Sequence, residues 1–390
     1  MKDTGVTMHI HKVSEGETQR DVASSYGVSP IKLAENNGIS HNGRLIPGEE
    51  LLILTPTRTV NARRGETLND LALRFGVSHE ALLAYNPELR GKCSLYDGQP
   101  LAVKHGIPSY GMGIGNGYYY RGCSVSKLVA NLPYMSYVTV AAGVVRKGIA
   151  MLFDDKEIVS LAKAAGKIPL FRIYTGKVES FDEWCEMIKG LAILARARNY
   201  GGITLAGVRC GSGSKLAEWT VEAKKILLEC DLKLFYEVDA EDDASHVDYA
   251  DGGILIYDKI HKTPIPSFDE GEHTILREYA ERHESLRTFV DLSPFAIVGG
   301  KYITKSEARD AILRSHGVME QNEAYGYTVG RCGRGRHEKL YVFESMSNTK
   351  RKLEAVSEEG YYGISFDIAR TSIYDLMMFA IMFSPGIKIT

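Results

Sequence analysis

Three things are scarce in this chain of 390 residues: paired cysteines, long apolar runs and an excess of one charge. No two of its six cysteines form a C-x-x-C pair, which argues against a zinc site and a disulfide framework and favours buried free thiols. They are Cys93, Cys123, Cys185, Cys210, Cys230 and Cys332. We therefore expect neither a metal nor a cofactor.

No apolar run is long enough for export or membrane insertion. Residues 1–11 lack the apolar core of a signal peptide, and residues 376–383 fall far short of the roughly 20 residues of a spanning helix. We expect a protein made in the cytosol.

The charges are nearly balanced, with 47 basic and 49 acidic residues and a formal net charge of -2. This balance makes nucleic acid an unlikely partner. The length exceeds one ordinary domain of roughly 100 to 200 residues, whereas a barrel of about 250 residues with something small beside it would fit.

The first hundred residues contain a repeat. Gly16-Glu17-Thr18 recurs as Gly65-Glu66-Thr67, and Gly27-Val28-Ser29 recurs as Gly76-Val77-Ser78 at the same displacement. Each copy has a short β run, two stretches of helical spacing with capping residues before them, and a closing apolar strand. We predict two small βααβ modules, at residues 8–55 and 58–104, joined by a short linker.

This pattern resembles the LysM family, whose motifs run through G-D-T-L, I-A, G-V-S and N to P-G-Q-x-L. The resemblance implies binding of N-acetylglucosamine polymers, peptidoglycan or chitin, in a groove between the first strand-helix turn and the second helix-strand turn. The sugar-binding positions would be Gly16, Glu17, Thr18, Asn37, Gly38, Ile39, Gly65, Glu66, Thr67, Asn86 and Pro87. The alternative is that these residues only cap helices and form turns, because caps and turns select the same residue types whatever the ligand.

From Gly106 onward, apolar strands alternate with amphipathic helices, which is typical of a parallel sheet with crossover helices. Eight strands are predicted, at residues 111–114, 137–141, 169–174, 202–208, 233–238, 253–257, 288–292 and 363–367. Helices are predicted between them, for example at 181–198, 215–228 and 274–282. The fold class is therefore α/β: a (β/α)₈ TIM barrel over residues 106–390, with an insertion between strands seven and eight.

Several stretches of this region are similar to glycoside hydrolase family 18, in particular to its LysM-bearing spore-peptidoglycan branch. Gly143-Val144-Val145 with Asp154-Asp155 matches the second strand and helix, Leu255-Ile256-Tyr257-Asp258 matches the M-x-Y-D motif, and residues 337–344, 350–353 and 363–365 follow the closing segment. The resemblance implies that Tyr257 and Asp258 could contact an N-acetyl group.

The chain departs from that family at the catalytic motif. The fourth strand of the family ends in D-G-x-x-x-D-x-E, whose glutamate is the general acid, but Gly201, Ala206 and Val208 stand at the three carboxylate positions. General acid help is worth a factor of about 10² to 10⁴. The family reaction is therefore predicted to be absent. A closing-strand tryptophan also is replaced, by Asp367 or Phe366.

Carboxylates recur at the ends of the later predicted strands, at Glu237, Asp239, Asp258, Asp291 and Asp367. Two carboxyls about 5 to 9.5 Å apart would suffice for ordinary glycoside hydrolysis, so a relocated active site using Glu237, Asp258, Asp291 and Asp367 is one alternative. Caps and loop ligands are the other. The basic stretch at residues 331–339 is either a contact for an anionic polymer or a solvated loop.

The main hypothesis is non-catalytic binding of an N-acetylglucosamine-containing cell-wall polymer, with the barrel as a scaffold or sugar-binding cleft. Family resemblance implies a place in the cortex or coat of a bacterial spore, or at the cell wall. Two alternatives remain: an active glycosidase with relocated carboxylates, and a structural component that binds other coat or wall proteins.

Overall fold

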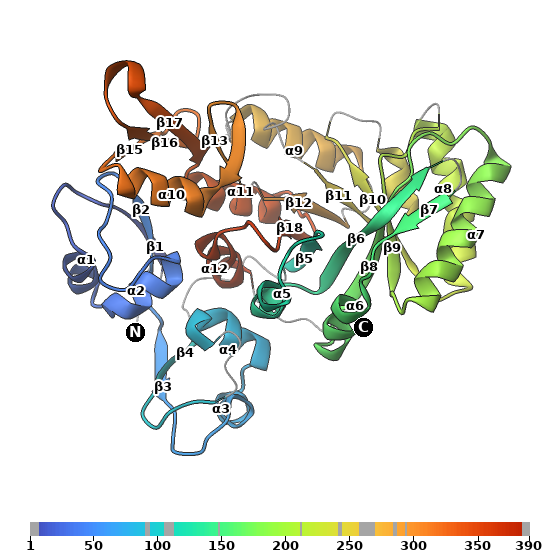
Figure 1. Cartoon of the computed structure of the whole chain (residues 1–390). Helices are drawn as coiled ribbons and strands as arrows, with labels where there is room; N and C mark the ends of the chain where they lie inside the picture. Colours follow the sequence, from blue (N-terminus) through green and yellow to red (C-terminus); the bar gives the residue numbers. More distant parts are fainter. Residues whose placement is uncertain are drawn as a thin grey trace.

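The computed structural model describes most of the chain (Figure 1). The described residues are 8–89, 94–104, 113–146, 149–210, 213–240, 244–256, 270–283, 287–292 and 295–383. They form two small modules at the amino-terminal end, a barrel, and a sheet inserted late in the barrel.

The first module is built from β1 (Met8–Lys12), α1 (Gln19–Tyr26), α2 (Pro30–Asn37) and β2 (Glu50–Leu54), with β1 and β2 antiparallel. Thr18 and Asp21 form a reciprocal capping box at the start of α1, and Gly27 ends that helix at a φ of 65°. The second module repeats the plan with β3 (Arg58–Asn61), α3 (Leu68–Phe75), α4 (His79–Tyr85), η1 (Pro87–Leu89) and β4 (Pro100–Lys104). The predicted βααβ modules are confirmed.

The barrel has eight parallel strands. They are β5 (Ile114–Tyr119), β6 (Tyr137–Arg146), β8 (Ile168–Tyr174), β9 (Gly202–Ala206), β10 (Lys233–Val238), β11 (Gly252–Leu255), β12 (Thr288–Asp291) and β18 (Gly363–Asp367). The sheet closes because β5 pairs with both β18 and β6. The predicted (β/α)₈ fold is confirmed.

The first barrel strand was predicted wrongly, at 111–114. It runs instead through Gly115 and Gly117, which are poor strand formers and hid its signal. Gly115 is required there, because a Cβ atom would lie 2.0 Å from the carbonyl oxygen of Tyr134.

Helices and short helical turns lie around the barrel (Figure 1). They are α5 (Val125–Asn131), η2 (Leu132–Tyr134), α6 (Lys156–Ala164), α7 (Phe181–Ala197), α8 (Gly213–Leu228), η3 (Ser245–Tyr249), α9 (Glu270–Arg282), α11 (Met346–Glu358) and α12 (Ile373–Met382). A short strand, β7 (Ile149–Leu152), folds back antiparallel on β6. The three helices predicted by range correspond to α7, α8 and α9.

The apolar core of the barrel has two layers. An inner cluster draws its buried residues from strands alone, among them Tyr137, Phe235 and Phe289, and therefore fills the barrel interior. An outer cluster packs the other face of the strands against helices, for example Leu205 and Val238 with Trp184. Alternate residues of each strand thus face the interior.

The insertion (residues 295–344) lies between β12 and β18, as predicted. It contains β13 (Phe295–Val298), β14 (Lys301–Thr304), α10 (Lys305–Arg314), β15 (Val318–Asn322), β16 (Tyr327–Cys332), η5 (Gly335–His337) and β17 (Lys339–Glu344). Its five strands form an antiparallel sheet in the order β14-β13-β17-β16-β15, so β15 is an edge strand.

The first module docks on that edge, where Figure 1 shows it beside the insertion. The carbonyl oxygen of Pro47 accepts a hydrogen bond from the backbone N–H of Met319 at 2.9 Å, and Ile46 is buried in the core of the insertion. Glu49 forms a buried ion pair with Arg309 of α10. The module thereby covers backbone groups of an edge strand that would otherwise be open to pairing with another chain.

Both modules also contact the barrel through α12, which lies against α2 and α4. The hydroxyl of Tyr134 donates to the carbonyl oxygen of Ala84 at 3.1 Å. Between the modules, the ammonium of Lys32 contacts the side chains of Asn86 and Glu88. The modules are therefore parts of one packed body.

The cysteines carry free thiols in the described part of the chain. Cys123, Cys210 and Cys332 are buried, Cys185 and Cys230 are half-buried, and Cys93 lies outside the described residues. Within the same residues, no three His, Cys, Asp or Glu side chains gather in a way suited to a metal ion. Nor does any described helix combine the length and the apolar character needed to cross a membrane.

The docking predicts an asymmetric response to mutation. Arg309→Ala leaves the buried carboxylate of Glu49 without its cation, so we expect the free energy of unfolding to fall by about 3 kcal/mol in denaturant titrations. Arg331→Ala is the matched control, because its partner Glu320 is exposed and the expected loss is much smaller. Equal losses in the two variants would contradict the buried pair.

Candidate functional site

An open groove of about 480 Å³ lies on the first module, and we call it the outer groove. The predicted residues Gly16, Glu17 and Thr18 form part of one wall, and residues 42–45 and 47 form the other. The groove thus runs between the first strand-helix turn and the loop that leads to β2. Arg20 and Arg44 also line it, and the sequence analysis had not selected either of them.

The predicted side chains in the outer groove are engaged in shaping their own turn. The carboxylate of Glu17 accepts hydrogen bonds from the N–H of Ser14 and from the ring of His11, both at 2.9 Å. Burial opposes ionisation of Glu17, but these two hydrogen bonds outweigh it and lower its pKa. Thr18 is held by Asp21 in the capping box.

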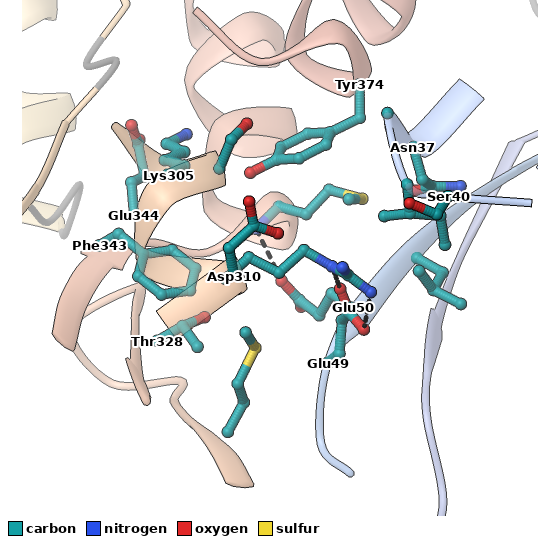
Figure 2. A pocket seen from close by; sticks show the side chains of 17 residues that line it. Asn37, Ser40, Glu49, Glu50, Lys305, Asp310, Thr328, Phe343, Glu344 and Tyr374 are labelled. Atoms are coloured by element: carbon teal, nitrogen blue, oxygen red, sulfur yellow. Dashed lines mark hydrogen bonds and ion pairs between the residues drawn. The ribbon is translucent and has the colours of Figure 1, made fainter. Parts of the chain in front are cut away.

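The remaining predicted residues of the first module do not face the outer groove. Asn37, Gly38 and Ile39 line a second space of about 210 Å³ between this module, the insertion and α12, which we call the inner cavity (Figure 2). A Cβ atom on Gly38 would lie 2.7 Å from Cγ2 of Ile373, so α12 closes over this turn. The structure therefore separates the predicted site of this module into two places.

Charged side chains surround the inner cavity, and the ion pairs that they form are with other side chains of the protein. Figure 2 shows Glu49, Glu50, Lys305 and Glu344 around it. Burial alone would lower the pKa of Lys305, but the carboxylates of Asp375 and Glu344 raise it above its ordinary value. The Lys305–Asp375 pair is 3.0 Å long and almost wholly buried. The cavity walls are thus a charged joint between the module and the barrel body.

Asn37 and Asn86 have the same structural role in the two modules. The side-chain amide of Asn86 donates to the carbonyl oxygens of Leu82 and Ala102 and accepts from the N–H of Ala102, each at 2.8 Å. Asn37 makes the matching bonds to Leu33 and Leu52. Both asparagines are buried and tie the second helix to the closing strand, so in this structure their side-chain amides are bonded to the backbone.

In the second module, Gly65 and Thr67 are exposed at the first turn. Glu66 accepts from the N–H of Arg63 at 2.8 Å and pairs with Arg74 at 3.1 Å, which repeats the turn-shaping role of Glu17. Pro87 is buried at the start of η1. Residues 90–93 of the facing loop lie outside the described residues, so only part of this wall is placed.

The motif positions of the barrel lie around β9. Gly201 precedes the strand, Ala206 is its last residue, and Val208 lies two residues beyond. Thr204 is in register with Phe235 of the inner cluster, so Thr204 and Ala206 share the face that points to the barrel interior. Ala206 is 1% exposed and carries no polar atom in its side chain.

Glu237, at the carboxyl end of β10, is tied to two neighbours. Its side chain is only 5% exposed and binds both Nε and Nη2 of Arg172, the latter at 2.7 Å. The hydroxyl of Tyr118 donates to the same carboxylate at 2.6 Å. Burial opposes the charge on Arg172, yet the hydrogen bond and the attraction of Glu237 raise its pKa further. The charge of Glu237 is therefore held in a fixed, bidentate pair.

The other carboxylates of the predicted ring are placed separately. Asp367 accepts from the N–H groups of Ala369 and Arg370 at 2.8 and 3.1 Å, which caps the turn after β18, although burial raises its pKa. Asp291 and Asp239 are half-buried at the ends of β12 and β10. Tyr257 and Asp258 lie outside the described residues.

Residues 11–54 and 62–104 match the family model described as LysM domain. The chain carries two LysM domains. We call them LysM1 and LysM2. A comparison with curated proteins found no match.

The whole chain is similar in fold to spore cortex-lytic enzymes. The similarity covers 97% of this chain and 99% of each of two crystal structures of the enzyme SleL. One is from Bacillus megaterium (15% identity, TM-score 0.74) and the other from Bacillus cereus (16% identity, TM-score 0.72). A similarity to a chitinase from Chromobacterium violaceum covers 68% of this chain and 98% of the chitinase (12% identity, TM-score 0.57). LysM1 and LysM2 are thus followed by a barrel of chitinase-like fold.

The sequence had not pointed to the two partners of Glu237 in the barrel. Arg172 stands in the otherwise apolar strand β8, and Tyr118 stands in the glycine-rich strand β5. A lone arginine at an interior position of a barrel strand requires a buried anion, since unpaired buried charge is strongly unfavourable. Arg172 could have been found by that signal.

The Arg172–Glu237 pair predicts a loss of stability when its carboxylate is removed. Glu237→Gln removes the anion that neutralises Arg172, so we expect the free energy of unfolding to fall by about 3 kcal/mol. Glu222→Gln is the matched control, because the Glu222–Lys225 pair is exposed and should contribute less than about 1 kcal/mol. A Glu237→Gln protein as stable as the parent would argue against the pair.

Proposed function

We propose that this protein binds an N-acetylglucosamine-containing cell-wall polymer through LysM1 and LysM2 and does not hydrolyse it, the barrel serving as a scaffold. The LysM family match supports the glycan as ligand, and the outer groove of LysM1 offers an open surface for it. The SleL structures are those of spore cortex-lytic enzymes, which supports peptidoglycan as the polymer and a spore cortex or coat, or the cell wall, as the setting.

One observation carries the non-catalytic part of the proposal: the interior-facing end of β9 presents Ala206, and the nearest strand end, that of β10, presents a carboxylate already bound to Arg172. A general acid must hold a proton and release it to the glycosidic oxygen. The side chain of Ala206 has no proton that it could transfer. Both carboxylate oxygens of Glu237 are already bound by the guanidinium of Arg172.

A second function, glycoside hydrolysis by relocated carboxylates, is favoured by one observation. Burial raises the pKa of Asp367, as a general acid requires. Against it, both backbone hydrogen bonds to this carboxylate are those of a capping residue. Asp367→Asn would abolish release of reducing ends if this function were real, whereas Asp239→Asn serves as a strand-end control.

The binding function predicts retention of the full chain on insoluble peptidoglycan. We expect the protein to sediment with the polymer and to release no reducing ends on prolonged incubation, because the general acid contribution of about 10² to 10⁴ is missing. Protein that stays in the supernatant would refute binding. Hydrolysis abolished by Asp367→Asn would refute the scaffold role of the barrel.

A further inference from the structure

We propose that the outer groove of LysM1 selects glycans that carry carboxylates, through the guanidinium groups of Arg20 and Arg44, and therefore selects peptidoglycan over chitin. This inference rests on the proposed function and names the substrate class that the LysM resemblance leaves open. Chitin is a neutral polymer of N-acetylglucosamine. Peptidoglycan has a lactyl group on alternate sugars, whose carboxyl is either free or joined by an amide bond to a stem peptide that carries carboxylates of its own.

The two arginines come from opposite walls of the outer groove. Arg20 lies in the first turn of α1, and Arg44 lies on the loop before β2. Both residues are exposed. A ligand lying in the groove would therefore have a cation on each side of it.

Neither guanidinium is neutralised by a carboxylate within 4.0 Å in the part of the chain that the structure describes. Arg44 donates from Nη1 to Nδ1 of the His316 ring at 3.0 Å, and this neighbour supplies no carboxylate. Arg20 adjoins Asp21 in sequence, but the carboxylate of Asp21 binds the N–H and hydroxyl of Thr18. The guanidinium groups are thus open to a ligand.

The one acidic side chain that lines the groove does not cancel this charge. Glu17 directs a single carboxylate oxygen to both the Ser14 N–H and the His11 ring, within its own turn. Two cations therefore face one anion that is already engaged. Arginine binds carboxylates through paired N–H groups, so an anionic ligand gains direct, charge-assisted hydrogen bonds here.

The repeat provides an internal comparison. At the positions equivalent to Arg20 and Arg44, LysM2 has Asn69 and Ser94, which are uncharged. Arginines at these two positions are thus a property of LysM1 and not of the LysM pattern. Selection for anionic glycan by this arrangement should be lost when LysM1 alone is changed.

The test measures affinities of the full chain for two soluble probes, muramidase-released peptidoglycan fragments and the N-acetylglucosamine hexamer. We expect Arg20→Gln and Arg44→Gln each to weaken fragment binding about tenfold, while hexamer binding changes less than about twofold. Raising the salt concentration should weaken fragment binding of the parent protein, since exposed charges are screened. Arg277→Gln, an exposed arginine on α9, is the matched control and should change neither affinity.

A further part of the experiment identifies which carboxylate of the ligand the arginines bind. Glycan strands stripped by an amidase keep only the lactyl carboxylate, whereas peptide-bearing fragments present those of the stem peptide. Loss of affinity in the arginine variants on one probe assigns the recognition to that group. Fragment binding that neither variant weakens, or equal weakening on the hexamer, would overturn the inference and leave the proposed function intact. Failure of the parent chain to bind either polymer would remove the proposed function itself.

Discussion

The arrangement of the protein depends on the cover that LysM1 places over β15, the exposed edge of the inserted sheet. One backbone hydrogen bond from the loop before β2, the burial of Ile46 and the Glu49–Arg309 pair join elements about two thirds of the chain apart. An uncovered edge would invite pairing with other chains. The docking therefore serves solubility of the insertion and, at the same time, decides which face of LysM1 remains available to a ligand.

The docking of LysM1 explains why its predicted sugar-binding residues lie in two separate places. The turn at Gly38 is closed by α12 and borders the inner cavity, whose ion pairs, such as Lys305–Asp375, are internal. The first turn remains open in the outer groove. Buried ion pairs are costly to desolvate, so their value at such a joint lies more in a fixed geometry than in net stability. Under the proposed function, the part of LysM1 that stays open to a ligand is the outer groove, which is lined by Arg20 and Arg44.

Most of the architecture could be predicted from the sequence, because repeats, alternation and the order of strands and helices are local signals. The first barrel strand was lost because Gly115 is chosen for close packing and not for strand propensity. Asn37 and Asn86 looked like ligand-binding residues because a buried amide that bonds backbone is the same residue type as one that bonds a sugar. The docking itself joins positions too far apart to be paired from one sequence.

The barrel holds polar side chains in its interior that bind one another. The interior of the barrel must be filled, and its buried polar groups must find hydrogen-bond partners. The Arg172–Glu237–Tyr118 group meets both needs without a substrate. LysM1 and LysM2 both contact α12 of the barrel body, so the two modules are packed against a common element and are not joined by a linker alone. For sites joined by a flexible linker, the gain from a second contact depends on linker length and reach. Where both modules are packed on the barrel, that gain would depend instead on whether one polymer can reach both of them.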